Sequence, residues 1–177
     1  IIPARGAWIE IETDVDGAFY VRIDRKRKFP ATALLRILGA QSEKEIFELF
    51  AAHPTARMHL VASCAKDHAK TTEEAYIEIH KRLRDGEIGS VENAKEFIRS
   101  IFEPERYDLS KVGRFRFNKR FGKPMDEKAL LRRTVSLDDC VTILAHIAEL
   151  QNTSGSREDD IDHLGSRRVR FVGELFQ

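Results

Sequence analysis

Apolar and polar side chains alternate along the first part of the chain. Residues 7–12 and residues 18–23 have a strand-like pattern, and residues 14–17 between them end in Gly17. Alternation with a period of two is typical of a half-buried strand, and a glycine in the connection supplies the positive φ that a tight turn needs. This part of the chain therefore predicts an antiparallel hairpin.

Beyond Pro30 the apolar positions change to a spacing of three and four. Five stretches have the pattern of amphipathic helices: residues 34–39, 42–51, 71–86, 90–104 and 136–150. Ser42 and Thr71 are each followed three residues later by Glu, which is the spacing of a capping box, and glycine or proline ends several stretches. The last stretch is the most periodic, with Leu137, Val141 and Leu144 on one face.

These elements predict an α+β fold, with a small antiparallel N-terminal sheet packed with a mainly helical body. The length, 177 residues, fits a single domain over residues 1–177. Within it we expect a hairpin part (1–30), a helical body (31–158) and a final segment (159–177) that begins a helix at its end.

Two basic regions are candidate binding surfaces. Residues 25–28 are four adjacent cations. This arrangement is consistent with the binding of a polyanion and equally with a solvated turn. A second region, residues 114–133, interleaves arginine and lysine with phenylalanine. Aromatic rings among cations can stack on bases. The alternation at Phe115 and Phe117 nevertheless predicts a short strand or an extended segment, with the rings in the core and the cations outside.

Trp8 is the single tryptophan, and its neighbours in residues 5–7 are small or basic. An exposed indole beside Arg5 can stack on an unpaired base, worth on the order of 1–3 kcal/mol. A core tryptophan with a satisfied indole N–H is the more common arrangement, and both interpretations stay open at this point.

The composition limits the possible functions. Apolar residues make up 42% of the chain and the net charge is +1, so any binding of nucleic acid must come from local basic patches. No apolar run has the length of a membrane span. Cys64 and Cys140 match no metal-ligand spacing and are predicted to be buried, reduced thiols. The sequence has no phosphate-binding glycine motif, no nucleophile elbow and no Cys–His pair in a local motif.

Residues 158–170 join a run of carboxylates to a run of arginines through Gly165. Burying so many charges would be costly, so the segment is predicted to lie at a surface or interface. The acidic part with His163 could in principle hold Mg²⁺ or Mn²⁺, as in a metal hydrolase. Consecutive carboxylates rarely converge on one ion, however, and we expect no metal here.

Four separated stretches, in the same order, resemble the bacterial RNA polymerase β subunit. Residues 2–8 resemble its I-P-x-R-G-x-W motif, and residues 21–36 its V-R-I-D-R-x-R-K-x-P-x-T-x-L-L-R motif. Residues 106–114 resemble R-Y-D-L-x-x-V-G-R, and residues 159–168 resemble D-D-I-D-H-L-G-x-R-R. The chain is therefore identified as similar to the lobe of that subunit.

The resemblance implies a wall of the main polymerase channel, in contact with the non-template strand and downstream DNA. Trp8 would stack on a non-template base, and Ile161, Asp162 and Arg167 would line part of a guanine pocket. The full set of implied DNA contacts is Trp8, Asp24, Arg25, Lys28, Arg84, Arg106, Ile161, Asp162 and Arg167.

The resemblance also implies that the chain is part of a nucleotidyltransferase while carrying no catalytic residues itself. The catalytic Mg²⁺ would be bound by another subunit, so no cofactor is expected in this chain. The expected partners are DNA, the β′, α and ω subunits and a sigma factor, in the bacterial cytoplasm with the nucleoid. An alternative is a docking platform for transcription factors with little direct DNA contact.

Overall fold

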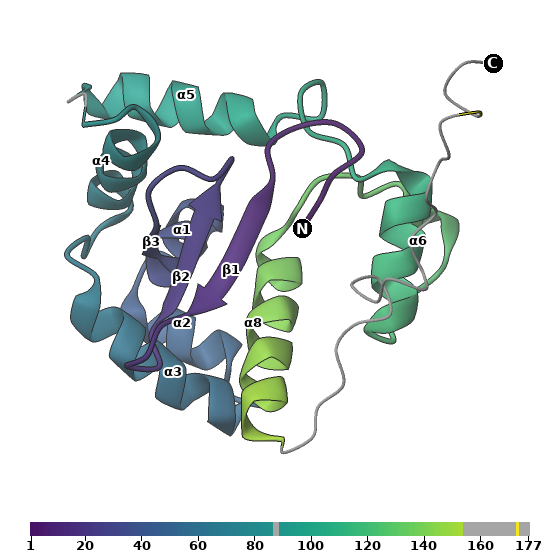
Figure 1. The fold of residues 1–177 in the computed structure, drawn as a ribbon, viewed down its shortest axis with the longest axis horizontal. Helices are drawn as coiled ribbons and strands as arrows, with labels where there is room; N and C mark the ends of the chain where they lie inside the picture. The colour runs from purple at the N-terminus through teal and green to yellow at the C-terminus, as the bar shows by residue number, and fades with distance from the viewer. Residues whose placement is uncertain (87–88, 154–172, 174–177) are drawn as a thin grey trace.

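The computed structural model describes residues 1–86, 89–153 and 173. Its sheet has three antiparallel strands in the order β1 (Ile9–Thr13), β2 (Phe19–Ile23) and β3 (Phe29–Pro30) (Figure 1). Ile9 pairs with Ile23 in the hairpin, and Tyr20 pairs with Pro30 across the second ladder. The predicted hairpin and the α+β class are confirmed.

The remaining described elements are helices. They are α1 (Ala31–Leu38), α2 (Glu43–Leu49), α3 (Pro54–Lys66), α4 (Thr72–Leu83), α5 (Val91–Phe102), α6 (Ser110–Arg120), α7 (Glu127–Leu130) and α8 (Leu137–Asn152). The hydroxyls of Ser42, Thr71, Ser90 and Ser136 accept the N-cap hydrogen bonds. These observed caps confirm the predicted starts of α2, α4, α5 and α8. The sequence patterns did not predict α3, α6 or α7.

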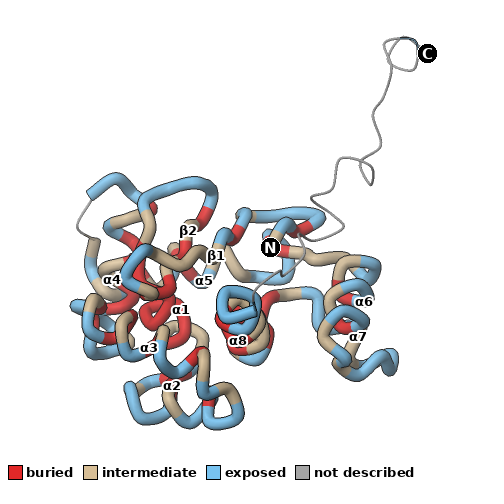
Figure 2. The backbone as a smooth tube through the Cα atoms, turned by 60° about the horizontal axis from the view of Figure 1, so that its bottom comes forward, coloured by how far each residue is buried: buried red, intermediate tan, exposed pale blue. Residues whose placement is uncertain are grey.

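The core lies between one face of the sheet and the helices behind it. Ile9, Phe19, Val21 and Ile23 are fully buried, since every second residue of β1 and β2 points inward. Buried residues gather around α1, α3, α8 and the sheet, whereas α6 and α7 are mostly exposed (Figure 2).

The prediction of an extended segment with buried phenylalanines was wrong. Residues 110–120 form helix α6, and Phe115 is 43% exposed. A period of two over four residues does not distinguish a strand from a helix, and 3.6 residues per turn places Phe115 and Phe117 on different sides. The buried residues of α6 are instead Arg114 and Asn118.

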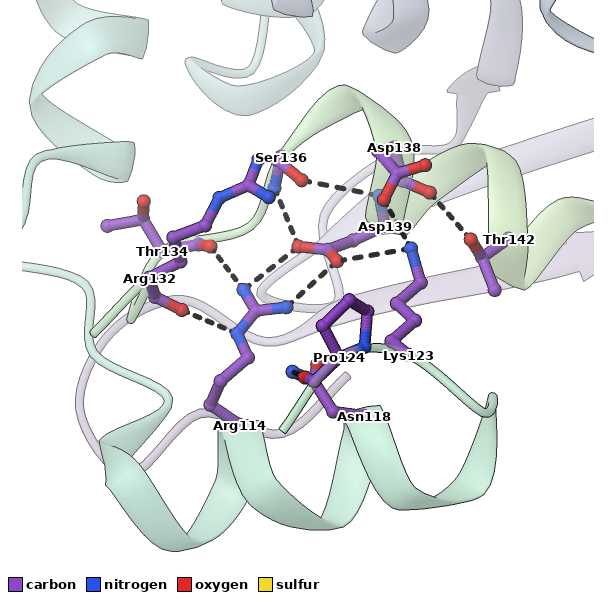
Figure 3. A network of polar contacts seen from close by, with 10 residues as sticks. All are labelled: Arg114, Asn118, Lys123, Pro124, Arg132, Thr134, Ser136, Asp138, Asp139 and Thr142. Atoms are coloured by element: carbon purple, nitrogen blue, oxygen red, sulfur yellow. Dashed lines mark hydrogen bonds and ion pairs between the residues drawn. The ribbon is translucent and has the colours of Figure 1, made fainter. Parts of the chain in front are cut away.

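Arg114 fastens α6 to the start of α8 (Figure 3). Its guanidinium donates to both carboxylate oxygens of Asp139, at 2.8 and 2.9 Å, and to the carbonyl oxygens of Arg132 and Thr134. Asp139 also accepts from the backbone N–H of Ser136, closing the α8 capping box. Burial raises the pKa of Asp139, but the hydrogen bonds from Arg114 and Ser136 outweigh it, and the net pKa lies below the ordinary value.

The segment before β1 is held against a distant part of the chain. The backbone N–H groups of Ala4 and Arg5 donate to the carbonyl of Asp108 at 2.8 and 3.1 Å, and the N–H of Asp108 donates back to Arg5 at 2.8 Å. Gly6 makes this approach possible, because it has φ +119° and a Cβ there would lie 2.8 Å from the carbonyl oxygen of Arg106.

Gly6→Ala is therefore expected to destabilise the fold by about 1–3 kcal/mol, through positive-φ strain and overlap with the backbone. Gly113→Ala is the matched control, because Gly113 lies inside α6 and a Cβ there meets its nearest neighbours at ordinary contact distances of 3.6 and 3.7 Å. Chemical denaturation of both variants measures the difference. Equal stability of the two variants would contradict the close approach at Gly6.

Candidate nucleic-acid interface

Trp8 lies at the open end of the β1–β2 ladder, one residue before β1. Its backbone N–H donates to Oδ1 of Asp24 at 2.7 Å, and the N–H of Asp24 donates to the carbonyl of Trp8 at 2.9 Å. The side chain of Trp8 is 40% exposed. The structure thus favours the exposed interpretation over a core tryptophan, and it makes Asp24 the residue that fixes the position of Trp8.

A tight turn after β2 brings a cation onto the indole. Asp24 and Arg25 have φ of 49° and 59°, and the N–H of Lys26 donates to the carbonyl of Ile23 at 3.0 Å. The guanidinium carbon of Arg25 lies 5.4 Å from the centroid of the Trp8 ring, within cation–π range. Trp8, Asp24 and Arg25 line a shallow cavity of about 210 Å³. A flat ring face, a carboxylate and a guanidinium are thus presented together.

The same turn is tied to the end of α4. Nζ of Lys26 lies 2.9 Å from Oδ2 of Asp85, and this hydrogen bond lowers the pKa of the Asp85 carboxyl. The adjacent Arg84 is the C-cap of α4, and its guanidinium lies 4.6 Å from the ring centroid of Phe97 in α5. Arg25 and Arg84, far apart in sequence, are thereby held on neighbouring segments.

Arg106 reaches the same region through the pairing of residues 4–5 with Asp108. It is exposed, and its guanidinium lies 3.4 Å from Oγ of Ser100. Asp108 is also paired with Arg133, whose hydrogen bonds lower the pKa of its carboxyl. In Figure 1 the loop before β1 lies beside the connection from α5 to α6. Segments carrying Trp8, Arg25, Arg84 and Arg106 therefore converge at one end of the sheet.

Lys28 lies apart from these residues. Its ammonium is 3.4 Å from Glu12 and 3.5 Å from Asp14, and 4.6 Å from the centroid of the Tyr20 ring. Glu12 and Asp14 lie toward the hairpin turn, at the opposite end of β1 from Trp8. The predicted contact at Lys28 is therefore not brought together with the other described positions.

Comparison with known proteins identifies the family. The model of the family described as RNA polymerase Rpb2, domain 2 matches residues 1–170. The DNA-directed RNA polymerase subunit beta of Syntrophomonas wolfei subsp. wolfei is 38% identical over 178 residues, which cover 100% of this chain and 15% of the relative. The subunit beta of Prochlorococcus marinus strain AS9601 is 36% identical over 179 residues, covering 100% of this chain and 16% of the relative.

The chain belongs to the RNA polymerase Rpb2, domain 2 family. The similarity covers the whole chain, which confirms the resemblance to the bacterial β subunit drawn from the four motifs. The chain spans about one-sixth of the length of these relatives.

Three of the predicted contacts in this Rpb2 domain, Ile161, Asp162 and Arg167, lie outside the described residues, as does the acidic cluster weighed as a metal site. Among residues 1–86 and 89–153, no group of His, Cys, Asp and Glu is placed to hold a metal ion. Within the same residues, no helix combines the length and apolarity needed to cross a bilayer. Both cysteines are buried and free, as predicted, and burial raises the pKa of Cys64 to about 11 and of Cys140 to about 12.

Sequence reasoning missed two residues that position the candidate interface of this Rpb2 domain. Asp85 anchors Lys26, and nothing in its local sequence indicates a partner 59 positions away. Gly6 allows the segment before Trp8 to approach residues 106–108, and a glycine inside a motif that precedes a strand was a signal of such an approach.

Proposed function

We propose that this chain is the DNA-contacting lobe of a DNA-directed RNA polymerase β subunit. In this role it lines the main DNA channel and contacts the non-template strand and downstream DNA during initiation and elongation. The observation that carries the proposal is the cluster of Trp8, Asp24 and Arg25, which presents a stacking surface and a cation at one end of the sheet.

The chemistry of this cluster suits an unpaired base. An exposed indole offers a π-face to any base, and a guanidinium beside it attracts the phosphate or adds a cation–π contact. Oδ1 of Asp24 is used by the N–H of Trp8, so Oδ2 can accept a hydrogen bond from a base edge. Arg84 and Arg106, on adjoining segments, extend the positive surface along a nucleic-acid backbone.

The proposal assigns the chemistry of nucleotide addition to other parts of the polymerase. A catalytic Mg²⁺ site needs convergent carboxylates, and in this proposal those carboxylates belong to another subunit. The lobe would act within an assembly of β′, α and ω subunits with a sigma factor, in the bacterial cytoplasm and on the nucleoid. Its contribution would be to hold the open DNA and set the lifetime of the bubble.

Charge removal at the interface tests the proposal. In a polymerase reconstituted with the variant subunit, Arg25→Ala and Arg84→Ala are each expected to shorten the lifetime of the open complex. The slope of log lifetime against log salt should fall by about one for each phosphate that the variant no longer neutralises.

Lys44→Ala is the matched control, because Lys44 is an exposed cation on α2 whose described partner is Glu48 of the same helix. If the two arginine variants and the control have the same salt slope and lifetime, the proposed DNA contacts are wrong.

A further inference from the structure

Helix α6 is attached to the rest of the fold by polar contacts rather than by an apolar face. Its buried residues are Arg114 and Asn118. Arg114 is paired with Asp139, and the side-chain amide of Asn118 donates to the carbonyl of Pro124 at 2.7 Å (Figure 3). Amphipathic helices ordinarily bury an apolar stripe. Helix α6 differs, because the side that it buries carries Arg114 and Asn118.

Two of the apolar residues of α6 therefore face outward. Val112 is 62% exposed and Phe115 is 43% exposed, and they lie three positions apart, so both belong to the outer side of the helix. Phe117 and Phe121 lie elsewhere, with ring centroids 4.8 Å apart, and Phe121 meets His146 of α8 at 5.3 Å. The exposure of Val112 and Phe115 is thus a property of one face and not of the whole helix.

Exposed cations surround this apolar pair. Lys111, Arg116 and Lys119 are all exposed, and residues 110–120 contain no Asp or Glu. Within the part of the chain that the structure describes, no carboxylate is paired with any of these three side chains. The face formed by Lys111, Val112, Phe115, Arg116 and Lys119, here called the α6 face, thus has an apolar centre and three cations of the same helix beside it.

We propose that the α6 face is a docking surface for an acidic amphipathic helix of a partner protein. Phe115 and Val112 would pack against the apolar side of that helix, and the three cations would pair with its flanking carboxylates. Because the α6 face is positive, charge complementarity requires a negatively charged surface on the partner. An aromatic residue flanked by arginine and lysine is also the composition typical of an interface centre and its charged rim.

The apolar pair favours a protein over a nucleic acid. Contacts to a duplex backbone are made by cations and other hydrogen-bond donors, and a branched aliphatic side chain such as Val112 gains little from them. When an amphipathic helix binds, its apolar side covers both Val112 and Phe115, and the burial of their apolar surface stabilises the complex. This surface lies on α6, away from the Trp8 cluster, and the proposal does not depend on the DNA-contacting role.

The test titrates the full chain into a fluorescein-labelled synthetic peptide and follows its anisotropy. The peptide is designed as a helix with glutamates along its flanks and leucines and phenylalanine along one side. A scrambled peptide of the same composition keeps the charge and removes the apolar side. A labelled duplex oligonucleotide is titrated in parallel as the nucleic-acid probe.

Phe115→Ala is expected to weaken peptide binding by about tenfold, as for an aromatic anchor at an interface centre. Lys119→Glu should weaken it by a comparable factor at low salt and by less at high salt. Met58→Ala and Lys44→Glu are the matched controls, since both side chains are exposed on other helices, and they should leave the affinity unchanged. The thermal unfolding curves of all four variants should coincide with that of the unaltered chain.

Three results would overturn the proposal. The first is that the unaltered chain does not bind the peptide, or binds the scrambled peptide equally well. The second is that Phe115→Ala has no more effect than Met58→Ala. The third is that Lys119→Glu weakens binding of the oligonucleotide while Phe115→Ala leaves peptide binding unchanged, which would make the α6 face a nucleic-acid surface.

Discussion

Replacing Arg114 with methionine is expected to lower the free energy of unfolding by about 3–5 kcal/mol, because it leaves the Asp139 carboxylate buried without its partner. The pair is almost completely buried, with side chains 4% and 5% exposed, and its geometry is bidentate. The loss should fall mainly on α6, whose other buried residue is Asn118. Chemical denaturation of the full chain measures the change.

Lys44→Met is the control, because it introduces the same side chain at an exposed ion pair that contributes about 0–1 kcal/mol. The double variant Arg114→Met with Asp139→Leu should recover much of the loss, since it removes both charges. If Arg114→Met costs no more than Lys44→Met, the ion pair does not fasten α6.

The same pair gives stability a dependence on pH. The pKa of Asp139 is lowered in the folded chain, so below about pH 5 the unfolded chain takes up a proton at this position before the folded chain does. The stabilisation is complete above the ordinary pKa of the carboxyl and is lost as the pH falls through the lowered one. Asp139→Asn should therefore lose less stability than the unaltered chain between neutral and acid pH.

Replacing Trp8 with alanine is expected to shorten the lifetime of the open promoter complex roughly 5- to 150-fold, the equivalent of removing one base–aromatic stack of about 1–3 kcal/mol. The exposed indole, its backbone bonds to Asp24 and the guanidinium of Arg25 are the reasons to expect a stack here. The lifetime is measured in a reconstituted polymerase by challenge with a competitor.

Trp8→Phe should retain most of the lifetime, because a smaller ring still stacks. Nucleotide addition on a preassembled scaffold should survive in both variants, since the proposal places catalysis elsewhere. An unchanged lifetime in Trp8→Ala would remove the stacking role, and loss of all nucleotide addition would contradict the separation of DNA holding from catalysis.

Local sequence signals predicted the elements that have N-terminal capping residues or a regular spacing of apolar residues. The hairpin, α4 and α8 were predictable because alternation, capping boxes and a regular apolar face all point to the same structure. Helix α3 was missed because its outward side carries Met58 and Val61, both exposed, so its apolar residues do not form one stripe. Helix α6 was misassigned because its buried residues are Arg114 and Asn118, and the burial of Arg114 depends on a partner in α8.

The sequence named candidate residues for the interface, but it did not give their arrangement in space. The resemblance named Trp8, Asp24 and Arg25 among the DNA contacts, a role that stays a prediction, and the structure places these three residues around one shallow cavity. The position of Lys28 could not be derived, because its ion pairs with Glu12 and Asp14 depend on the strand register. The exposure of Trp8 was equally undetermined, since a single aromatic residue at a strand end suits either the core or the surface.

The most direct test of the central claim places a photo-crosslinking amino acid, benzoylphenylalanine, at position 8 of the subunit and irradiates the polymerase on promoter DNA labelled on one strand at a time. The account predicts crosslinks to the non-template strand near the start site, and none from the same amino acid at the exposed position 58 of α3. Crosslinks confined to the template strand or to protein would contradict it.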